Sequence, residues 1–286
     1  MLRFAPSPNG PLHRGHALSL LANEAMADVL GLPLTIRMED IDQSRARPAF
    51  ERAILADIAW LGVAWTPPMR RQSEHFADYR DALTRLSARG LIYPSFATRR
   101  EIAQAMRPGA PRDPDGAPRF IGDDAILGEA ETARRRAGQT PAAWRLHMAR
   151  AVDLVGTPTF RTVTADGTPD GEMPADPLAW GDVVLARKDT PTSYHLSVVV
   201  DDAHQGISHV VRGADLLAAT AVHRVLQTLL DLPAPAYRHH PLILGPDGRK
   251  LSKSAGAESL EALAADGLTP GALRATLEPI LREEPA

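Results

Sequence analysis

The sequence contains no cysteine, which excludes disulfide bonds and cysteine-ligated zinc sites. No apolar run approaches the roughly 18 residues that a membrane-spanning helix requires, and prolines after Arg3 stand where a signal peptide would have its apolar core. The net charge of −3, from 32 basic and 35 acidic residues, gives no overall attraction to nucleic acid. We therefore expect a cytoplasmic protein without membrane contact, in which a nucleic-acid partner would need a local basic patch.

The length of 286 residues suffices for one large α/β domain, or for one domain that carries an insertion. Apolar spacing predicts a strand over 2–5, a helix over 17–30 and a strand over 34–38. This order indicates a parallel sheet, because parallel neighbours need a crossover connection. Further helices are predicted over 48–61, 76–86, 124–137 and 216–230. Further strands are predicted over 91–93, 144–148, 183–186, 197–200, 209–213 and 241–244.

Proline and glycine concentrate over 107–122, and a second loose stretch covers 164–177, so both predict irregular loops. The predicted fold is a doubly wound parallel α/β sheet of the Rossmann type with an inserted α+β subdomain. Ligands of such sheets bind beyond the carboxyl ends of the strands. The predicted segments are 1–96 and 181–245 for the two halves of the main domain, 97–180 for the insertion, and 246–286 for a basic loop with a short helical part.

The loop after the first predicted strand, from Pro6 to His16, has the features of an anion site. Its prolines and glycine exclude regular structure, and a helical pattern begins directly after it. The backbone N–H groups and the dipole of that helix favour a bound anion, and His13 and His16 can donate to phosphate. The loop lacks the Gly-x-Gly-x-x-Gly and Gly-Lys-Ser/Thr patterns, which excludes the usual dinucleotide and P-loop sites. Alone, it also fits a proline-rich turn with surface histidines.

A second basic cluster, Lys250-Leu251-Ser252-Lys253-Ser254, lies near the end of the chain. Alone it fits a solvated basic turn, but together with His13-Arg14-Gly15-His16 it resembles the two signature motifs of class I aminoacyl-tRNA synthetases. Other stretches resemble the glutamyl-tRNA synthetase family, and the resemblance covers nearly the whole chain except the insertion. These stretches are 3–13, 37–42, 193–196, 198–202 and 211–215.

The resemblance implies a class I synthetase catalytic domain that activates an amino acid with ATP and Mg²⁺. Such a reaction places negative charge on phosphorus, so the site needs donors around the phosphates more than a general base. Lysines on a flexible loop suit this task, because they can close over the leaving pyrophosphate. The implied ATP-binding positions are His13, Gly15, His16 and Lys253, and the implied catalytic donors are His13, His16, Lys250 and Lys253.

The same resemblance implies L-glutamate as the amino acid. Arginine makes paired charge-assisted hydrogen bonds with a carboxylate, and a site built on such bonds rejects neutral analogues. Arg3 and Arg212 stand at predicted strand ends on the ligand edge, and Glu39 can accept from the ammonium group. Taken without the motifs, the two arginines also fit exposed surface positions. Glu39 also fits an ion pair with a neighbouring arginine, and Tyr194 also fits a position in the core. The implied glutamate-binding positions are Arg3, Phe4, Ala5, Pro6, Ser7, Glu39, Tyr194 and Arg212.

Asp201 and Asp202 end a predicted strand and raise the question of a metal site. One carboxylate pair offers too few ligands for a site built by the protein alone. We therefore expect ion-pair or helix-capping roles for them, no protein-bound metal, and Mg²⁺ that arrives with ATP.

Two departures from the family pattern indicate a subfamily. Full glutamyl-tRNA synthetases carry a helical anticodon-binding region after the second motif, and we expect none here, because only 255–286 remain. Glutamyl-queuosine tRNA(Asp) synthetases are relatives with the catalytic part alone. Resemblance to them implies transfer of glutamate to queuosine in tRNA(Asp). We also expect the protein to be a monomer. The alternatives are a discrete catalytic unit charging tRNA(Glu), a nucleotidyltransferase with a His-x-Gly-His loop, and a non-catalytic binding relic.

The second departure concerns zinc. Members of that subfamily often bind a zinc ion through cysteines that follow a Tyr-Pro pair. Here Ser95 and Ala97 follow Tyr93-Pro94, and neither side chain can replace a thiolate ligand. We therefore expect no structural zinc and an insertion that is held by its own packing.

Overall fold

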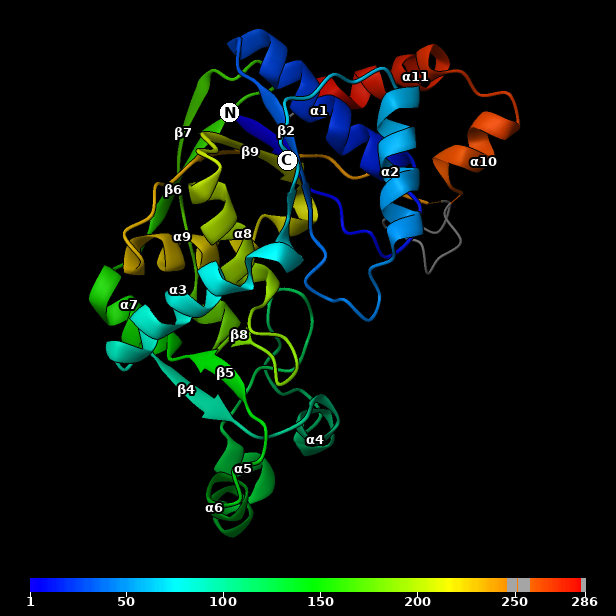
Figure 1. Cartoon of the computed structure of the whole chain (residues 1–286). Coiled ribbons are helices and arrows are strands. Elements are labelled where there is room, and N and C mark those ends of the chain that lie inside the picture. Colours follow the sequence, from blue (N-terminus) through cyan, green and yellow to red (C-terminus); the bar gives the residue numbers. More distant parts are fainter. Residues whose placement is uncertain (246–250, 252–257, 284–286) are drawn as a thin grey trace.

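In the computed structural model of the chain, the first group of parallel strands comes from the N-terminal part (Figure 1). Strand β1 (Leu2–Phe4) pairs in parallel with β2 (Leu34–Met38), and β2 pairs in parallel with β3 (Arg70–Arg71). Helix α1 (Arg14–Leu30) connects β1 to β2, as the sequence predicts. Helix α2 (Pro48–Trp60), which begins with proline at its first position, connects β2 to β3.

The second group of strands comes from later in the chain. Strand β10 (Ala236–His240) is parallel to both of its neighbours, β9 (His209–Gly213) and β6 (Thr159–Val163). Strand β7 (Pro169–Pro174) adds an antiparallel edge to β6. The predicted strand over 209–213 is therefore confirmed, and a strand replaces part of the loose stretch predicted over 164–177.

Strands β1 and β9 bring the two groups side by side. The N–H of Ser208, directly before β9, donates to the carbonyl of Met1 at 3.0 Å. A guanidinium N–H of Arg3 donates to the carbonyl of Val211 at 3.4 Å. The parallel strands thus follow the order β3-β2-β1-β9-β10-β6, whose direction of growth reverses between β1 and β9. In a sheet of this kind the ligand crevice lies at that point, which is consistent with the predicted Rossmann-type fold.

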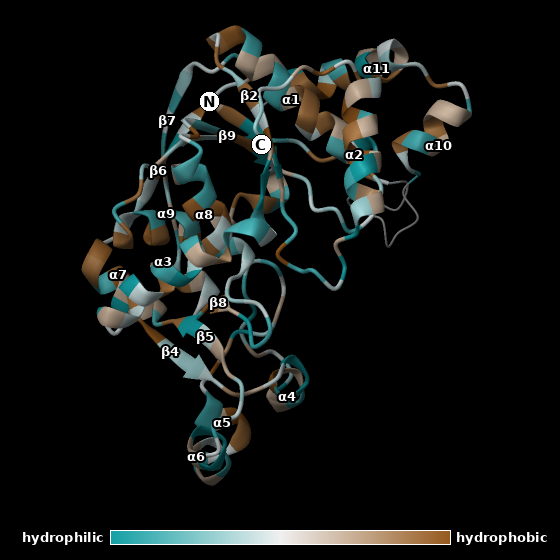
Figure 2. Ribbon diagram, in the orientation of Figure 1, coloured by the Kyte–Doolittle hydropathy of each residue, from teal (hydrophilic) through white to brown (hydrophobic). Residues whose placement is uncertain are grey.

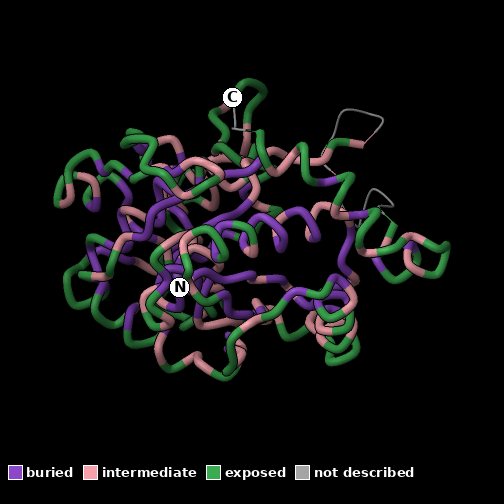
Figure 3. Tube along the Cα trace, turned by 90° about the horizontal axis from the view of Figure 1, so that it is seen from above, coloured by how far each residue is buried: buried purple, intermediate pink, exposed green. Residues whose placement is uncertain are grey.

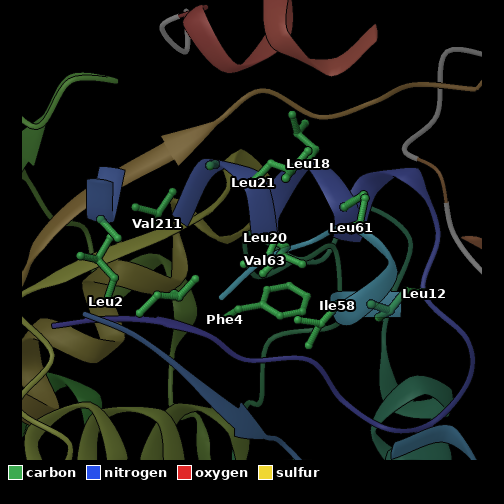
Figure 4. Close-up of a cluster of buried hydrophobic side chains, with 14 of the residues drawn as sticks. Leu2, Phe4, Leu12, Leu18, Leu20, Leu21, Ile58, Leu61, Val63 and Val211 are labelled. Carbon is green, nitrogen blue, oxygen red and sulfur yellow. The ribbon is translucent and has the colours of Figure 1, made fainter. Parts of the chain in front are cut away.

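One face of the sheet is covered by α1 and α2 together with the C-terminal helices α10 (Leu260–Ala265) and α11 (Pro270–Arg282). Buried side chains of α1 and α2 meet Phe4 of β1 and Val211 of β9 in one apolar cluster (Figure 4). Because successive side chains of a strand point to opposite faces, Arg3 and Arg37 point away from this cluster, toward the opposite face.

The opposite face is covered by α8 (Tyr194–His204) and α9 (Ala219–Leu229). Val210 belongs to this side and packs with Tyr237 and Ala221. Further helices complete the main domain and the connections. They are α3 (Phe76–Ala88), α4 (Arg99–Ala105), α5 (Asp123–Leu127), α6 (Glu129–Ala137), α7 (Met148–Val155) and the short 3₁₀ turns Gln72–His75, Leu178–Trp180 and Ala214–Leu216.

A separate antiparallel sheet lies at the far end of the molecule (Figure 1). Its strands are β4 (Ile92–Ser95), β5 (Ala143–Leu146) and β8 (Val184–Ala186), in that order. Helices α4, α5 and α6 extend beyond it, and polar residues run along α6 (Figure 2). Pairing crosses the predicted boundaries at 97 and 180 in both directions, because β4 and β8 lie outside 97–180 and β6 lies inside it. The division of the chain into four segments stays a prediction.

Two predicted strands are wrong. The apolar run at 197–200 lies in helix α8, whose residues Leu196, Ser197, Val199 and Asp201 are all buried. Burial on most sides removes the exposed polar stripe that would mark a helix, and a short apolar run then fits a strand equally well. The second wrong strand is the one predicted over 241–244. The strand in this region is β10, which lies earlier in the chain and ends at His240.

The predicted helix over 124–137 is also wrong in one respect. It is divided into α5 and α6 at Gly128, whose φ of 85° no residue with a side chain adopts easily. The glycine therefore turns the chain and ends the first helix.

The structure describes residues 1–245, 251 and 258–283. Lys250 and Lys253 of the predicted second motif lie outside this part, so nothing is said of their placement. No helix within the described part is long and apolar enough to span a bilayer.

Several charged side chains are buried in the interior, and Figure 3 shows long buried stretches of the chain in purple. The carboxylate of Asp201 on α8 accepts from Arg70 Nε at 2.7 Å, from Gln72 Nε2 at 2.7 Å and from the hydroxyl of Tyr79 at 2.9 Å. A second arginine, Arg37, lies 3.9 Å from the same carboxylate. The predicted ion-pair role of Asp201 is thereby confirmed, and it ties α8 to β2 and β3.

We predict that Asp201→Ala lowers the free energy of unfolding by about 3–5 kcal/mol, because it leaves buried guanidinium groups without their carboxylate. Glu278→Ala is the control, since Glu278 pairs with Arg282 on the exposed side of α11 and its loss costs at most about 0.5 kcal/mol. Urea unfolding of both variants measures this difference. Equal stabilities would contradict the buried network.

Candidate functional site

A cavity of about 510 Å³ opens at the carboxyl ends of β1, β9 and β10, beside the start of α1. All the described residues that the sequence predicts for the site line this one cavity. They are Arg3, Phe4, Ala5, Pro6, Ser7, His13, Gly15, His16, Glu39, Tyr194 and Arg212. The contribution of Lys250 and Lys253 stays a prediction.

The two histidines of the first motif form a capping box at the start of helix α1. His13 is the N-cap, and its Nδ1 accepts the N–H of Gly15 at 3.1 Å. In return, Nδ1 of His16 accepts the N–H of His13 at 3.1 Å. Because Nδ1 is an acceptor in both rings, each neutral ring carries its proton on Nε2. The capping box therefore fixes both rings as Nε2–H donors beside the amino end of a helix, where an anion is favoured.

One residue of the second motif and the chain after the motif are held at the same cavity. Leu251 lines it, and its N–H donates to the carbonyl of Ile243 at 3.1 Å. After the motif, the N–H of Leu260 donates to the carbonyl of Leu12 at 2.9 Å, and Ser259 bridges to His13. The chain after the second motif thus contacts the loop that carries the first.

One wall of the cavity rests on a buried carboxylate of α8. Asp202 accepts from Arg3 Nε at 3.0 Å and from Arg37 at 2.7 Å. Arg37 also lies 3.4 Å from Glu39, at the end of β2. Burial of Asp202 favours its neutral form, but the two guanidinium groups outweigh it and hold the pKa of Asp202 below its usual value. This carboxylate thereby fixes Arg3 and, through Arg37, Glu39.

The opposite wall carries Arg212, which is 4% exposed. Its guanidinium donates to the hydroxyl of Tyr194 at 3.3 Å and to the carbonyl of Leu216 at 3.1 Å. Three further acceptors come from side chains that the sequence analysis does not assign to the site. They are His239 Nε2 at 3.2 Å, His223 Nδ1 at 3.1 Å and Thr220 Oγ1 at 2.7 Å. No sequence motif marks these three residues, because α9 and β10 bring them to Arg212 only in the fold.

A second cavity of about 180 Å³ adjoins the first. The two share Ser7, Asn9, Glu39, Arg45 and Tyr194. The second adds charged residues of both signs at its rim, where Arg187 lies 3.9 Å from Asp42. A ligand in the second cavity would pass Glu39 and Tyr194 to reach the first cavity.

A carboxylate holds the stretch after Tyr93-Pro94, where the subfamily often has zinc-binding cysteines. Asp123 accepts from the N–H groups of Phe96 at 2.8 Å and Ala97 at 2.9 Å, and from the hydroxyl of Ser95 at 3.2 Å. Within the described part of the chain, no group of three or more histidine or carboxylate side chains could hold a metal ion. The expectation of no structural zinc stays a prediction.

Comparison with known proteins gives a consistent result. Residues 1–280 match the family described as tRNA synthetases class I (E and Q), catalytic domain. A glutamyl-Q tRNA(Asp) synthetase of Rhodobacter capsulatus is 44% identical over 280 residues, which cover 95% of this chain and 97% of that protein. Another, of Nocardia farcinica, is 41% identical over 276 residues, which cover 96% of this chain and 82% of that protein.

Solved structures confirm the predicted fold. A glutamate tRNA ligase from Elizabethkingia meningosepticum, in complex with its amino acid, is similar with a TM-score of 0.66 and 27% identity, over 89% of this chain. The chain spans about half of that ligase, 52% of its length. A methionyl-tRNA synthetase of Mycobacterium tuberculosis bound by methionyl-adenylate has a TM-score of 0.55 at 16% identity, over 96% of this chain and 63% of that chain, and so shows the fold alone.

The histidines around Arg212 predict a distinct response to acid. Burial, with a smaller contribution from Arg212, lowers the pKa of His195 to about 4 and that of His239 to about 2, and holds the pKa of His223 well below 6.5. The unfolded chain takes up these protons near pH 6.5 and the folded protein does not. The free energy of unfolding therefore falls as the pH drops below 6.5, by up to about 1.4 kcal/mol per pH unit for each histidine.

We expect His239→Gln to remove one of these contributions, so that stability falls less steeply between pH 6 and pH 5, by up to about 1.4 kcal/mol per pH unit. Urea unfolding of both proteins at several pH values in this range measures the slopes. Carboxylates elsewhere in the fold whose pKa is shifted contribute equally to the slopes of both proteins, so their contributions cancel in the comparison. Identical slopes would show that His239 is not kept neutral by the fold.

Proposed function

This chain belongs to the family of class I tRNA synthetases for glutamate and glutamine, and from that membership we propose that it activates L-glutamate with ATP and transfers it to queuosine in tRNA(Asp). The observation that carries the proposal is the shared cavity. It combines the Nε2–H donors of His13 and His16 with two walls, one that carries Arg3 and Glu39 and one that carries Arg212. A single cavity can thus receive a nucleotide and an amino acid with two carboxylates.

In the first proposed step, an oxygen of the glutamate α-carboxylate attacks the α-phosphorus of ATP. The bond to the β-phosphate breaks, and pyrophosphate leaves with the electron pair. His13 and His16 donate hydrogen bonds to the phosphoryl oxygens, whose charge grows in the transition state. Lys250 and Lys253 supply positive charge to the leaving pyrophosphate, and Mg²⁺ enters with ATP as its phosphate-bound ion.

Glutamate would be oriented by the two walls. The carboxylate of Glu39 accepts from the ammonium group of the substrate, because Arg37 fixes this carboxylate and it lines the cavity. Arg212, together with the hydroxyl of Tyr194, faces the side-chain carboxylate. Burial raises the pKa of Tyr194, so its hydroxyl keeps the proton that it donates.

In the second proposed step, a hydroxyl of queuosine attacks the carbonyl carbon of glutamyl-adenylate. The bond to the phosphate oxygen breaks, AMP leaves, and the hydroxyl proton passes to the departing phosphate. The smaller cavity supports this route, because it meets the first at Glu39 and Tyr194 and carries Arg45 and Arg187 for a nucleic-acid phosphate.

The main alternative is a catalytic unit that charges tRNA(Glu) at its acceptor end. The first step is the same in both reactions, so the acceptor RNA separates them. Identities of 44% and 41% to proteins named glutamyl-Q tRNA(Asp) synthetase, over nearly the whole chain, favour tRNA(Asp). A nucleotidyltransferase with a His-x-Gly-His loop would not need Arg3, Glu39 and Arg212 around the same cavity.

We predict that the protein, given ATP, Mg²⁺ and labelled glutamate, labels tRNA(Asp) from queuosine-containing total tRNA. Total tRNA from cells unable to make queuosine is the control and should remain unlabelled. Nuclease digestion then locates the label in the anticodon loop. Label at the acceptor end of tRNA(Glu) in both preparations would contradict the proposal and support the alternative.

A further inference from the structure

The guanidinium of Arg212 has all five of its N–H groups occupied by the protein, and every acceptor is neutral. The acceptors are His239, His223, Tyr194, Thr220 and the carbonyl of Leu216. No ion pair links Arg212 to a carboxylate among the described residues. Arg3, across the same cavity, differs, because Asp202 neutralises it at 3.0 Å.

The hydrogen bonds fix the protons of this cluster. Arginine can only donate, so Nδ1 of His223 must accept, and its proton lies on Nε2, which faces Nδ1 of His195 at 3.3 Å. By the same reasoning, Nε2 of His239 accepts from Arg212, and its proton lies on Nδ1. The hydroxyl of Thr220 accepts from Arg212 and lies 3.2 Å from the same nitrogen of His239. A protonated histidine would present a donor to a donor at either position.

We propose that His223, His239 and Thr220 are positioning residues that hold Arg212 as a cation without a counter-charge, so that the site selects an amino acid with an anionic side chain. This inference rests on the proposed function, because it concerns how glutamate is told from glutamine. Neutral acceptors fix the guanidinium in place without cancelling its charge. A carboxylate at the same positions would hold it equally well and would remove the attraction for the substrate.

The energetic contrast follows from burial. A buried positive charge without a partner is unfavourable, and a substrate carboxylate that approaches it relieves this cost. An amide has the same shape but carries no charge, so it leaves Arg212 uncompensated. Because all five N–H groups of Arg212 are occupied, the hydroxyl of Tyr194 donates the hydrogen bond to the substrate carboxylate, and a hydrogen bond to an ionised group is roughly twice as strong as a neutral one. We therefore expect the cluster to contribute about 10²-fold to the preference for glutamate over glutamine.

The test places a carboxylate in the cluster. His239→Glu and, independently, Thr220→Asp supply Arg212 with a counter-charge, whereas His239→Gln and Thr220→Ser keep a neutral acceptor. His204→Glu makes the same change of residue at an exposed position of α8. Glutamate- and glutamine-dependent ATP–pyrophosphate exchange, with tRNA present and absent, gives KM and kcat for each variant.

We expect the carboxylate variants to raise the KM for glutamate by about 30–100-fold and to reduce the glutamate-to-glutamine preference by a similar factor. The KM for ATP should change less than threefold, and the neutral variants and His204→Glu should stay within about fivefold of the parent protein. Unchanged KM and preference in both carboxylate variants, or equal losses in the neutral variants, would overturn the inference.

Calorimetric binding of glutamate separates this inference from the proposed function. If the parent protein binds glutamate but catalyses no exchange, the proposed function fails, and the binding constants of the same variants still decide the inference. If the parent protein binds no glutamate, both fail.

Discussion

The site depends on one buried carboxylate, that of Asp202, between two arginines of neighbouring strands. Arg3 and Arg37 point to the face of the sheet that α8 covers, and without a negative charge they would repel each other in the interior. Asp202 accepts from both at 3.0 and 2.7 Å. Because Arg3 and Arg37 belong to the first strands and Asp202 to a helix from the other half of the chain, this contact helps to join the two halves where the sheet reverses its order of strands.

The two walls of the cavity then differ in charge balance. On the side of Arg3, the guanidinium groups of β1 and β2 meet Asp202 and Glu39, so positive and negative charges are matched. On the side of Arg212, the groups of the described residues that accept from the guanidinium are all neutral. An amino acid that carries an ammonium group and two carboxylates can complete both walls, whereas a neutral side chain leaves the second wall unbalanced. The first loop adds two histidine donors at the position where a nucleotide would meet the amino acid.

Much of this arrangement follows from the sequence, and the parts that do not have physical reasons. The first strand, loop and helix carry local signals, since prolines, glycines and helical spacing act over a few residues. The run at 197–200 gives no such signal, because α8 is buried on most sides and lacks a polar stripe. His223, Thr220 and His239 are brought to Arg212 by a helix and a strand that follow it, and long-range contacts of this kind leave no local pattern. The second motif is predicted by resemblance, and its lysines lie outside the described residues.

The claim that nucleotide and amino acid share one cavity is tested most directly by calorimetry with a non-reactive glutamyl-adenylate analogue, such as glutamyl-sulfamoyl adenosine. One molecule should bind per chain, far more tightly than ATP or glutamate alone, and saturating analogue should abolish the binding of both. Asp202→Asn should weaken the analogue much more than it weakens ATP, because it releases Arg3 and Arg37. An analogue that binds no more tightly than ATP, or that leaves glutamate binding intact, would contradict this account.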